Sequence, residues 1–144
     1  MALAVVALET SENQGHLVAR TAEYSQDKME QLLALAFNDS SSNTATVPTV
    51  SSGGTGLAIG GGSNPSSPVT GYVDYLDSSG NILAASGGSA PSGWFYIRVW
   101  SIAAGPTDAT NTKLITVTTE VQSQVGTNGA LPQSTVTALK VNPF

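Results

Sequence analysis

The chain has 144 residues and a formal net charge of −5, from five Lys/Arg and ten Asp/Glu. This length predicts a single domain with room for a core. The acidic balance argues against binding to nucleic acid or anionic lipid, because five scattered cations cannot neutralise a track of phosphates. The absence of Cys excludes disulfides and thiolate sites, and the single histidine, His16, leaves no imidazole pair for zinc. We therefore expect no enzyme activity, no catalytic residue, no metal and no cofactor.

An apolar run from Ala2 to Leu8 opens the chain without a basic region or a small-residue cleavage site, so it is not a secretory signal. As a helix, its seven residues rise about 10 Å, a third of the hydrocarbon thickness of a bilayer. The run therefore either packs against protein or ends a longer apolar helix. Its candidate subunit-interface residues are Leu3, Val5, Val6 and Leu8.

Residues 1–38 are predicted to form one long amphipathic helix. The segment 2–37 lacks proline, contains one glycine and is rich in helix formers. Apolar residues at helical spacing form a stripe that we assign to packing on a sheet: Val18, Ala22, Met29, Leu33 and Ala36. A second stripe faces either a neighbouring subunit or the interior: Leu17, Tyr24 and Leu35. Asn38 and Asp39 compete with helical hydrogen bonds, so the helix should stop at Phe37 or Asn38.

A long connection and a sheet region follow. Residues 39–68 carry no charge after Asp39 and contain three prolines and six glycines, which predicts an irregular loop. From residue 69 the hydropathy period becomes two. The segment 72–83 reads as a hairpin, with Gly80 and Asn81 supplying positive φ in its turn. Further strands are predicted at 94–100, 113–121 and 134–141.

These elements predict an α+β fold in a single globular domain. A long N-terminal amphipathic helix (1–38) is joined through the loop 39–68 to a sheet region (69–144), and the helix packs on an antiparallel sheet of about four strands.

One strand carries a candidate ligand or partner face. It alternates, with Phe95, Ile97 and Val99 on one side and four polar-tipped or aromatic residues on the other: Trp94, Tyr96, Arg98 and Trp100. If the helix covers the first side, these four are exposed and can stack on a sugar, a peptide or a neighbouring subunit. If the helix covers the second side, they belong to the core.

Two carboxylates flank the hairpin turn. Asp74 and Asp77 lie near carbonyl groups, as calcium ligands do. However, Asp77 precedes Ser-Ser-Gly, a pattern more typical of a turn-forming aspartate that accepts backbone N–H groups. No metal site is assigned.

The order of these features resembles the type IV pilin superfamily, and in particular its minor pilins. The residues that carry the resemblance are Ala22…Lys28-Met29-Glu30-Gln31-Leu32, Tyr72-x-Asp74-x-x-Asp77-x-x-Gly80, Tyr96-x-Arg98-x-Trp100-x-Ile102 and Lys113-x-Ile115-x-Val117. The family's peptidase site and early glutamate have no match here, because the first glutamate is Glu9, at the end of the apolar run. The resemblance therefore implies that an N-terminal anchor is missing.

The resemblance implies a structural subunit of a type IV pilus that contributes to filament assembly and surface display. Its partners are other pilin subunits, bound through the N-terminal helix, or a separate anchor-helix chain. Membrane contact is expected only through the missing segment. The implied location is the extracellular filament or cell surface, after passage through the inner membrane and periplasm. The alternatives are a type II secretion pseudopilin and an adhesin-like binding module; a hydrolase using His16 is a remote third.

Overall fold

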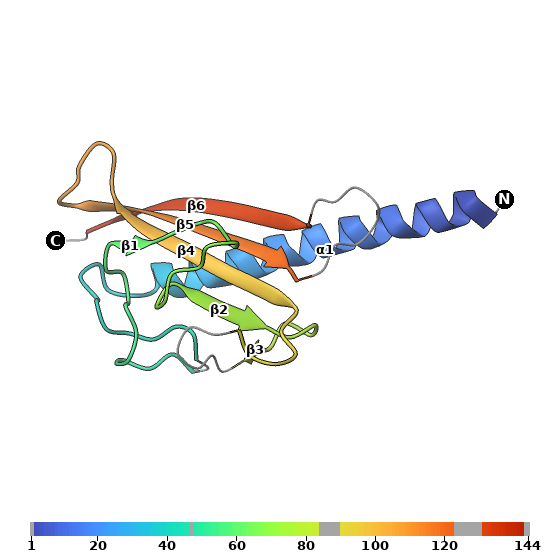
Figure 1. The fold of residues 1–144 in the computed structure, drawn as a ribbon. Helices are drawn as coiled ribbons and strands as arrows, with labels where there is room; N and C mark the ends of the chain where they lie inside the picture. Colours follow the sequence, from blue (N-terminus) through green and yellow to red (C-terminus); the bar gives the residue numbers. More distant parts are fainter. Residues whose placement is uncertain (1, 47, 84–89, 123–130, 143–144) are drawn as a thin grey trace.

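The computed structural model describes residues 2–46, 48–83, 90–122 and 131–142, with side chains described from Gly15 onward (Figure 1). It contains one helix in these residues, α1 (Ala2–Leu33). The strands are β1 (Gly60–Gly61), β2 (Val73–Leu76), β3 (Ile82–Leu83), β4 (Tyr96–Ala104), β5 (Thr112–Val121) and β6 (Gln133–Val141).

The strands form one antiparallel sheet in the order β3-β2-β4-β5-β6, with β1 pairing β4 outside this path. The register of β4 and β5 runs from Tyr96 opposite Val121 to Ala104 opposite Lys113. The register of β5 and β6 runs from Thr112 opposite Val141 to Glu120 opposite Gln133. Within the described residues β6 pairs with β5 alone, so it forms one edge of the sheet.

The predicted architecture, a long helix on about four strands, is wrong. The sheet has six strands, and strands rather than helix dominate the part of the chain whose side chains are described. One additional strand, β1, lies inside the predicted loop 39–68. Its two glycines carry no hydropathy pattern, and Gly61 has a φ of +81° with the Trp100 carbonyl and the Tyr72 ring packed against it. The sequence period therefore gave no signal for this strand.

The helix also ends earlier than predicted, at Leu33 instead of Phe37 or Asn38. The carbonyl of Leu33 accepts a hydrogen bond from Lys140 Nζ at 2.7 Å. After Leu33 the chain forms turns with hydrogen bonds between residues three apart: Leu35 N–H donates to the Leu32 carbonyl, and Asp39 N–H donates to the Ala36 carbonyl. A lysine from β6 thus satisfies a carbonyl that the helix end leaves free.

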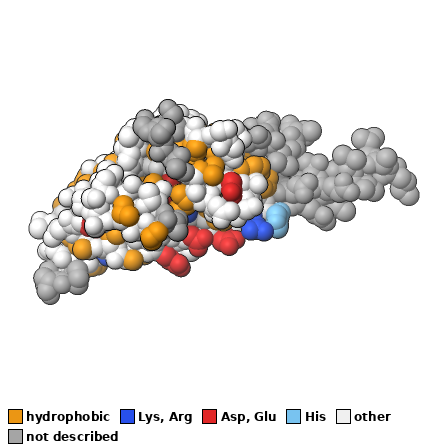
Figure 2. All heavy atoms as spheres, turned by 90° about the horizontal axis from the view of Figure 1, so that it is seen from below, with side chains coloured by type: hydrophobic (Ala, Val, Ile, Leu, Met, Phe, Trp, Pro, Cys, Tyr) orange, Lys and Arg blue, Asp and Glu red, His pale blue; other side chains and the backbone are white. Residues whose placement is uncertain are grey.

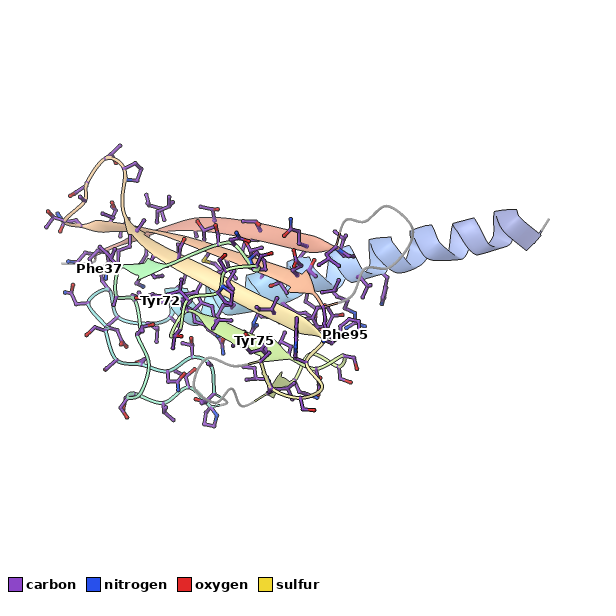
Figure 3. The ribbon with its side chains drawn as sticks, in the orientation of Figure 1. Phe37, Tyr72, Tyr75 and Phe95 are labelled. Carbon is purple, nitrogen blue, oxygen red and sulfur yellow. The ribbon has the colours of Figure 1, made fainter. Side chains whose placement is uncertain are left out.

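The predicted hairpin is confirmed, and so is the predicted alternation from Tyr96 to Trp100. The sides predicted for Trp94 and Phe95 are wrong, because Trp94 packs with Ile97 and Val99, whereas Phe95 packs with Tyr96 on the side that the helix covers. β2 and β3 pair with Tyr75 opposite Leu83, and the turn places Gly80 at a φ of +87°, while Asn81 does not adopt positive φ. Both sides of β4 are buried: Ile97 and Val99 pack with β2 on one side, and Trp100 packs in the helix-covered core on the other. In Figure 3, Tyr72 and Tyr75 lie near β2, and the labelled Phe37 and Phe95 lie farther out on either side of them.

The core has two clusters between α1 and the sheet, and a third on the other side of the sheet, formed by Val73, Tyr75, Ile97 and Val99. The larger of the two clusters between α1 and the sheet is formed by Met29, Leu32, Leu57, Tyr72, Trp100, Ile102, Ile115 and Val117. The smaller of these two is formed by Tyr24, Leu76, Tyr96 and Val121. Leu57 is fully buried although it belongs to the predicted loop, so that segment helps to close the end of the core.

The helix face that meets the sheet differs from the predicted one. Val18 is 42% exposed, Ala22 and Ala36 are exposed, Leu33 is half-buried, and only Met29 of that stripe is buried. The residues that do face the sheet, with none of their surface exposed, are Thr21, Ser25, Lys28 and Leu32. Their spacing of four, three and four is helical, but three of them are polar. Hydropathy alone selected the wrong flank because these polar groups find partners in the sheet.

The second predicted stripe is directed inward. Tyr24 is 6% exposed in the smaller core cluster, and Leu17 and Leu35 are half-buried against the two clusters between α1 and the sheet. The interior option, and not a free subunit interface, describes these three residues. Leu3, Val5, Val6 and Leu8 lie in the part of α1 outside the described side chains.

Candidate functional site

Three charged side chains meet between the helix and the sheet, and we call Lys28, Asp74 and Arg98 the charged cluster. The Asp74 carboxylate receives two hydrogen bonds from Arg98, from Nε at 2.7 Å and from Nη2 at 2.8 Å. Lys28 Nζ lies 2.7 Å from the second carboxylate oxygen of Asp74. All three residues are at most 3% exposed. The cluster therefore joins α1, β2 and β4 through charges that are almost completely removed from water.

The backbone positions these groups by simple periodicity. Asp74 and Arg98 are directly opposite each other in the β2–β4 register, so their side chains leave the same side of the sheet. Lys28 lies one helical turn after Ser25 on the sheet-facing side of α1. Two cations and one anion leave an excess of one positive charge.

Neutral acceptors surround this excess charge. Lys28 Nζ donates to the Thr44 carbonyl at 2.8 Å and lies 4.6 Å from the centre of the Trp100 ring. Arg98 Nη1 donates to the Tyr24 carbonyl at 3.2 Å. Carbonyl dipoles and an aromatic face both attract a cation, so the cluster is satisfied without a second acid.

Burial acts on the two signs of charge in different ways. Burial lowers the pKa of Lys28 to about 8, against the opposing attraction of the Asp74 carboxylate. Burial would raise the pKa of Asp74, but the charges and hydrogen bonds of Arg98 and Lys28 outweigh it and hold this pKa below its ordinary value. Asp74 is therefore ionised at neutral pH, whereas the pKa of Lys28 lies close to neutral pH.

A row of hydroxyl groups joins the helix to β5 and β6, and we call Thr21, Ser25, Thr119 and Ser134 the hydroxyl row. Ser25 Oγ donates to Thr119 Oγ1 at 2.7 Å and also approaches the Ser134 carbonyl at 3.1 Å. Thr21 Oγ1 and Ser134 Oγ lie 2.8 Å apart. These small side chains let the helix backbone approach the sheet closely while their polar atoms stay paired.

Four of the chain's five cations donate to backbone carbonyl groups. Besides Lys28 and Arg98, Lys113 Nζ donates to the carbonyls of Phe37 and Leu57, and Lys140 Nζ donates to that of Leu33. In the part of α1 whose side chains are described, the acidic residues are exposed instead: Glu23, Asp27 and Glu30. Figure 2 shows acidic side chains gathered on one face, with a basic side chain between them and the single histidine. Apart from the exposed Arg20, the positive charges of the chain thus bind backbone carbonyl groups, whereas the exposed surface of α1 is mainly acidic.

Two small cavities adjoin these contacts. One, of about 200 Å³, lies between the segments 42–45 and 53–55 and Trp100. The other, of about 260 Å³, is lined by residues of α1 and β2–β3 that include Tyr24, Gln31 and Arg98. Both are smaller than the roughly 300 Å³ at which small-molecule pockets begin, and neither places a nucleophile beside a general base.

The predicted ligand face is not an open surface. Tyr96, Arg98 and Trp100 are 2–3% exposed beneath the helix, and Trp94 is half-buried, with its ring 5.5 Å from that of Tyr75 on the other side of the sheet. Of the two alternatives for this strand, burial is the one observed. The structure brings Arg98 and Trp100 together with Lys28, whereas Trp94 lies apart.

Asp77 acts as a turn former. Its carboxylate accepts the N–H groups of Ser79 and Asn81 at 2.9 Å, and these hydrogen bonds from Asn81 and Ser79 lower its pKa. Asp74, the other carboxylate considered as a calcium ligand, belongs to the charged cluster. In the described part of the chain no group of three or more His, Asp or Glu side chains is arranged to hold a metal ion. His16 is exposed on α1.

The charged cluster was not predicted, although the sequence contains a signal for it. Asp74 and Arg98 each interrupt an apolar strand segment, Tyr72-Val73-Asp74-Tyr75-Leu76 and Tyr96-Ile97-Arg98-Val99-Trp100. A charge inside a continuous apolar strand is buried unless it lies at an edge, and opposite charges in two such strands predict an ion pair. The participation of Lys28 has no comparable local signal.

No family model matches this chain, and neither a curated protein nor a solved structure is significantly similar to it. Within the described residues, no helix combines the length and apolar character that crossing a bilayer requires.

Proposed function

We propose that the protein is a structural subunit of a type IV pilus, related to the minor pilins, and that it joins the filament through the N-terminal part of α1. The observation that carries this proposal is the position of the helix. Its C-terminal half is fixed to the sheet by the charged cluster and the hydroxyl row, while the ribbon continues beyond the sheet toward the N-terminus (Figure 1).

The sequence of that extension suits contact with other helices. Ala2 to Leu8 contains no polar residue, so it gains free energy by leaving water. A helix that is rigidly held at one end presents the other end in a defined direction. This arrangement supports a subunit whose folded domain is carried by a bundle of helices.

The proposal is tested in the source organism with an epitope inserted in the exposed β4–β5 turn, at residues 107–110. Filaments sheared from the cells are expected to carry the epitope in immunogold microscopy. A variant with Leu3→Asp and Val6→Asp is expected to be folded but absent from filaments. The epitope on intact cells but never on sheared filaments would overturn the proposal.

The same strain separates the pilus subunit from a secretion pseudopilin. Surface display of the epitope should disappear when the pilus assembly ATPase is deleted and persist when a type II secretion ATPase is deleted. The reverse dependence would identify the pseudopilin and contradict the pilus assignment.

A further inference from the structure

The free edge of β6 is the feature of the molecule that the proposed function leaves without a role. The β5–β6 pairing places the backbone hydrogen bonds of Ser134, Val136, Ala138 and Lys140 toward β5, as shown by the flanking bonds of Val121 N–H to the Pro132 carbonyl and Asn142 N–H to the Asn111 carbonyl. The alternate residues direct their N–H and C=O groups away from the sheet. These residues are Gln133, Thr135, Thr137, Leu139 and Val141.

Within the described residues, the β6 edge carries none of the features that prevent strand addition. Its five outward residues are all exposed, and none is charged or proline. Lys140, the lysine of the strand, is directed to the opposite side, where it binds the Leu33 carbonyl. A strand edge nine residues long, whose five outward residues are uncharged, is a template for another strand.

A neutral flank of α1 adjoins the same edge. Because a helix turns about 100° per residue, Tyr24, Asp27 and Gln31 fall on one side of the sheet-facing line, next to β2 and β3. The opposite side, which we call the neutral helix flank, therefore faces the β6 edge. It consists of Val18, Ala22, Gln26 and Leu33.

We propose that β6 pairs antiparallel with β6 of a second copy of this chain, and that the neutral helix flanks of the two copies pack against each other. When a two-fold axis lies between Thr137 and the second copy's Thr137, all nine residues of β6 are paired, and Thr135 lies opposite the second copy's Leu139. No like charges meet in this register.

The spacing of the elements favours a second copy over an unrelated strand. The helix packs mainly on β5 and β6 and little on β4. With neighbouring strands about 4.8 Å apart, two helices centred on the β5–β6 pairs of the two copies lie about 10 Å apart. This is the distance at which helices pack directly, about 8–10 Å. A second copy thus covers the strand edge and the helix flank together.

The same geometry identifies facing residues. Ser134 contacts α1 at Thr21 and Ser25, and Lys140 contacts it at Leu33. This two-fold axis therefore passes near the middle of this helical segment, and Ala22 lies close to the second copy's Leu33. This inference does not depend on the proposed filament function.

The test is the oligomeric state of the purified full chain, followed by sedimentation velocity from about 5 µM to about 1 mM, where weak association becomes visible. The wild type is expected to form a dimer. Thr137→Pro, which removes an outward N–H group, and Thr137→Lys are expected to weaken association at least tenfold. Thr110→Lys, in the exposed β4–β5 turn, is the matched control and should have no effect.

The helix flank is tested by a second matched pair. Ala22→Glu introduces a charge on the neutral helix flank and is expected to weaken the dimer at least tenfold, whereas Ala19→Glu, on an exposed position turned away from the sheet, should not. Circular dichroism checks that each variant is folded. A chain that is monomeric at about 1 mM, or a dimer that Thr137→Lys and Ala22→Glu leave unchanged, would overturn the proposal.

Discussion

The charged cluster and the hydroxyl row connect the same helix to the same sheet by different chemistry. Toward β2 and β4, Lys28 reaches a carboxylate that also binds Arg98, and all three groups are desolvated. Toward β5 and β6, Ser25 and Thr21 make short contacts between neutral hydroxyl groups. Removing one member of a buried charged group leaves an unpaired charge, whereas removing one hydroxyl leaves an unpaired dipole. The two sides should therefore respond very differently to single substitutions.

The largest effect is expected for Asp74→Asn. It leaves Lys28 and Arg98 buried without an anion, which should lower the free energy of unfolding by about 3–5 kcal/mol. Urea denaturation followed by tryptophan fluorescence measures this, because Trp100 is buried beside Lys28. The control is Asp27→Asn on the exposed surface of α1, which should change stability by less than about 0.5 kcal/mol.

The same variant changes the response to acid. Because the pKa of Asp74 is lower in the fold than in the unfolded chain, its contribution is complete above the ordinary aspartate pKa of about 3.9 and is lost as pH falls through the folded value. As pH falls, the free energy of unfolding of Asp74→Asn should therefore decrease less than that of the wild type, because the variant has no carboxylate to protonate at this position. Equal stability of Asp74→Asn and Asp27→Asn at neutral pH would show that the cluster is not a strong connection.

The next effect concerns Lys28 and alkaline pH. The folded pKa of about 8 lies below that of an unfolded lysine, so between these values the unfolded chain holds a proton that the fold has released. The wild type should gain stability as pH rises through this window, by at most about 1.4 kcal/mol per pH unit. Lys28→Met should lack this gain. The difference between the two unfolding curves measured from pH 7 to pH 10 is the test.

At neutral pH, Lys28→Met should cost much less than Asp74→Asn. It leaves one cation and one anion in the cluster, and the methionine fills the same narrow space beside Trp100. We expect a loss below about 1.5 kcal/mol. Parallel pH curves for the wild type and Lys28→Met would contradict the assigned titration of Lys28.

On the hydroxyl row, Ser25→Ala should lower the free energy of unfolding by about 1–2 kcal/mol. It leaves the Thr119 hydroxyl, which has no exposed surface, without its donor. Glu30→Ala, at an exposed position of the helix outside the neutral helix flank, is the matched control and should be nearly neutral. A loss for Ser25→Ala as large as that for Asp74→Asn would remove the distinction between the two connections.

Sequence reasoning succeeded where the determining contacts are local. The β2–β3 hairpin followed from Asp77 and Gly80 in one tight turn, and the alternation of β4 was readable within one strand. It failed on the helix, because Ser25 and Lys28 are buried against partners that are distant in the sequence. Ser25 binds Ser134, and Lys28 binds Asp74. Apolar Val18 and Ala22 looked better suited to a core than these polar residues. Their exposure shows that paired polar groups can displace an apolar stripe from a sheet.

The smallest effect is expected at the end of the helix, where Lys140 binds the Leu33 carbonyl from β6. Lys140→Met keeps the aliphatic length but removes a cation from a helix C-terminus, which should cost about 0.5–1 kcal/mol in urea denaturation. Part of this effect should disappear in high salt, because the side chain is only half-buried. Ser25→Ala, a neutral change, should not depend on salt. This contrast separates a charge–dipole contact from the hydroxyl contacts, although both join α1 to the same strand.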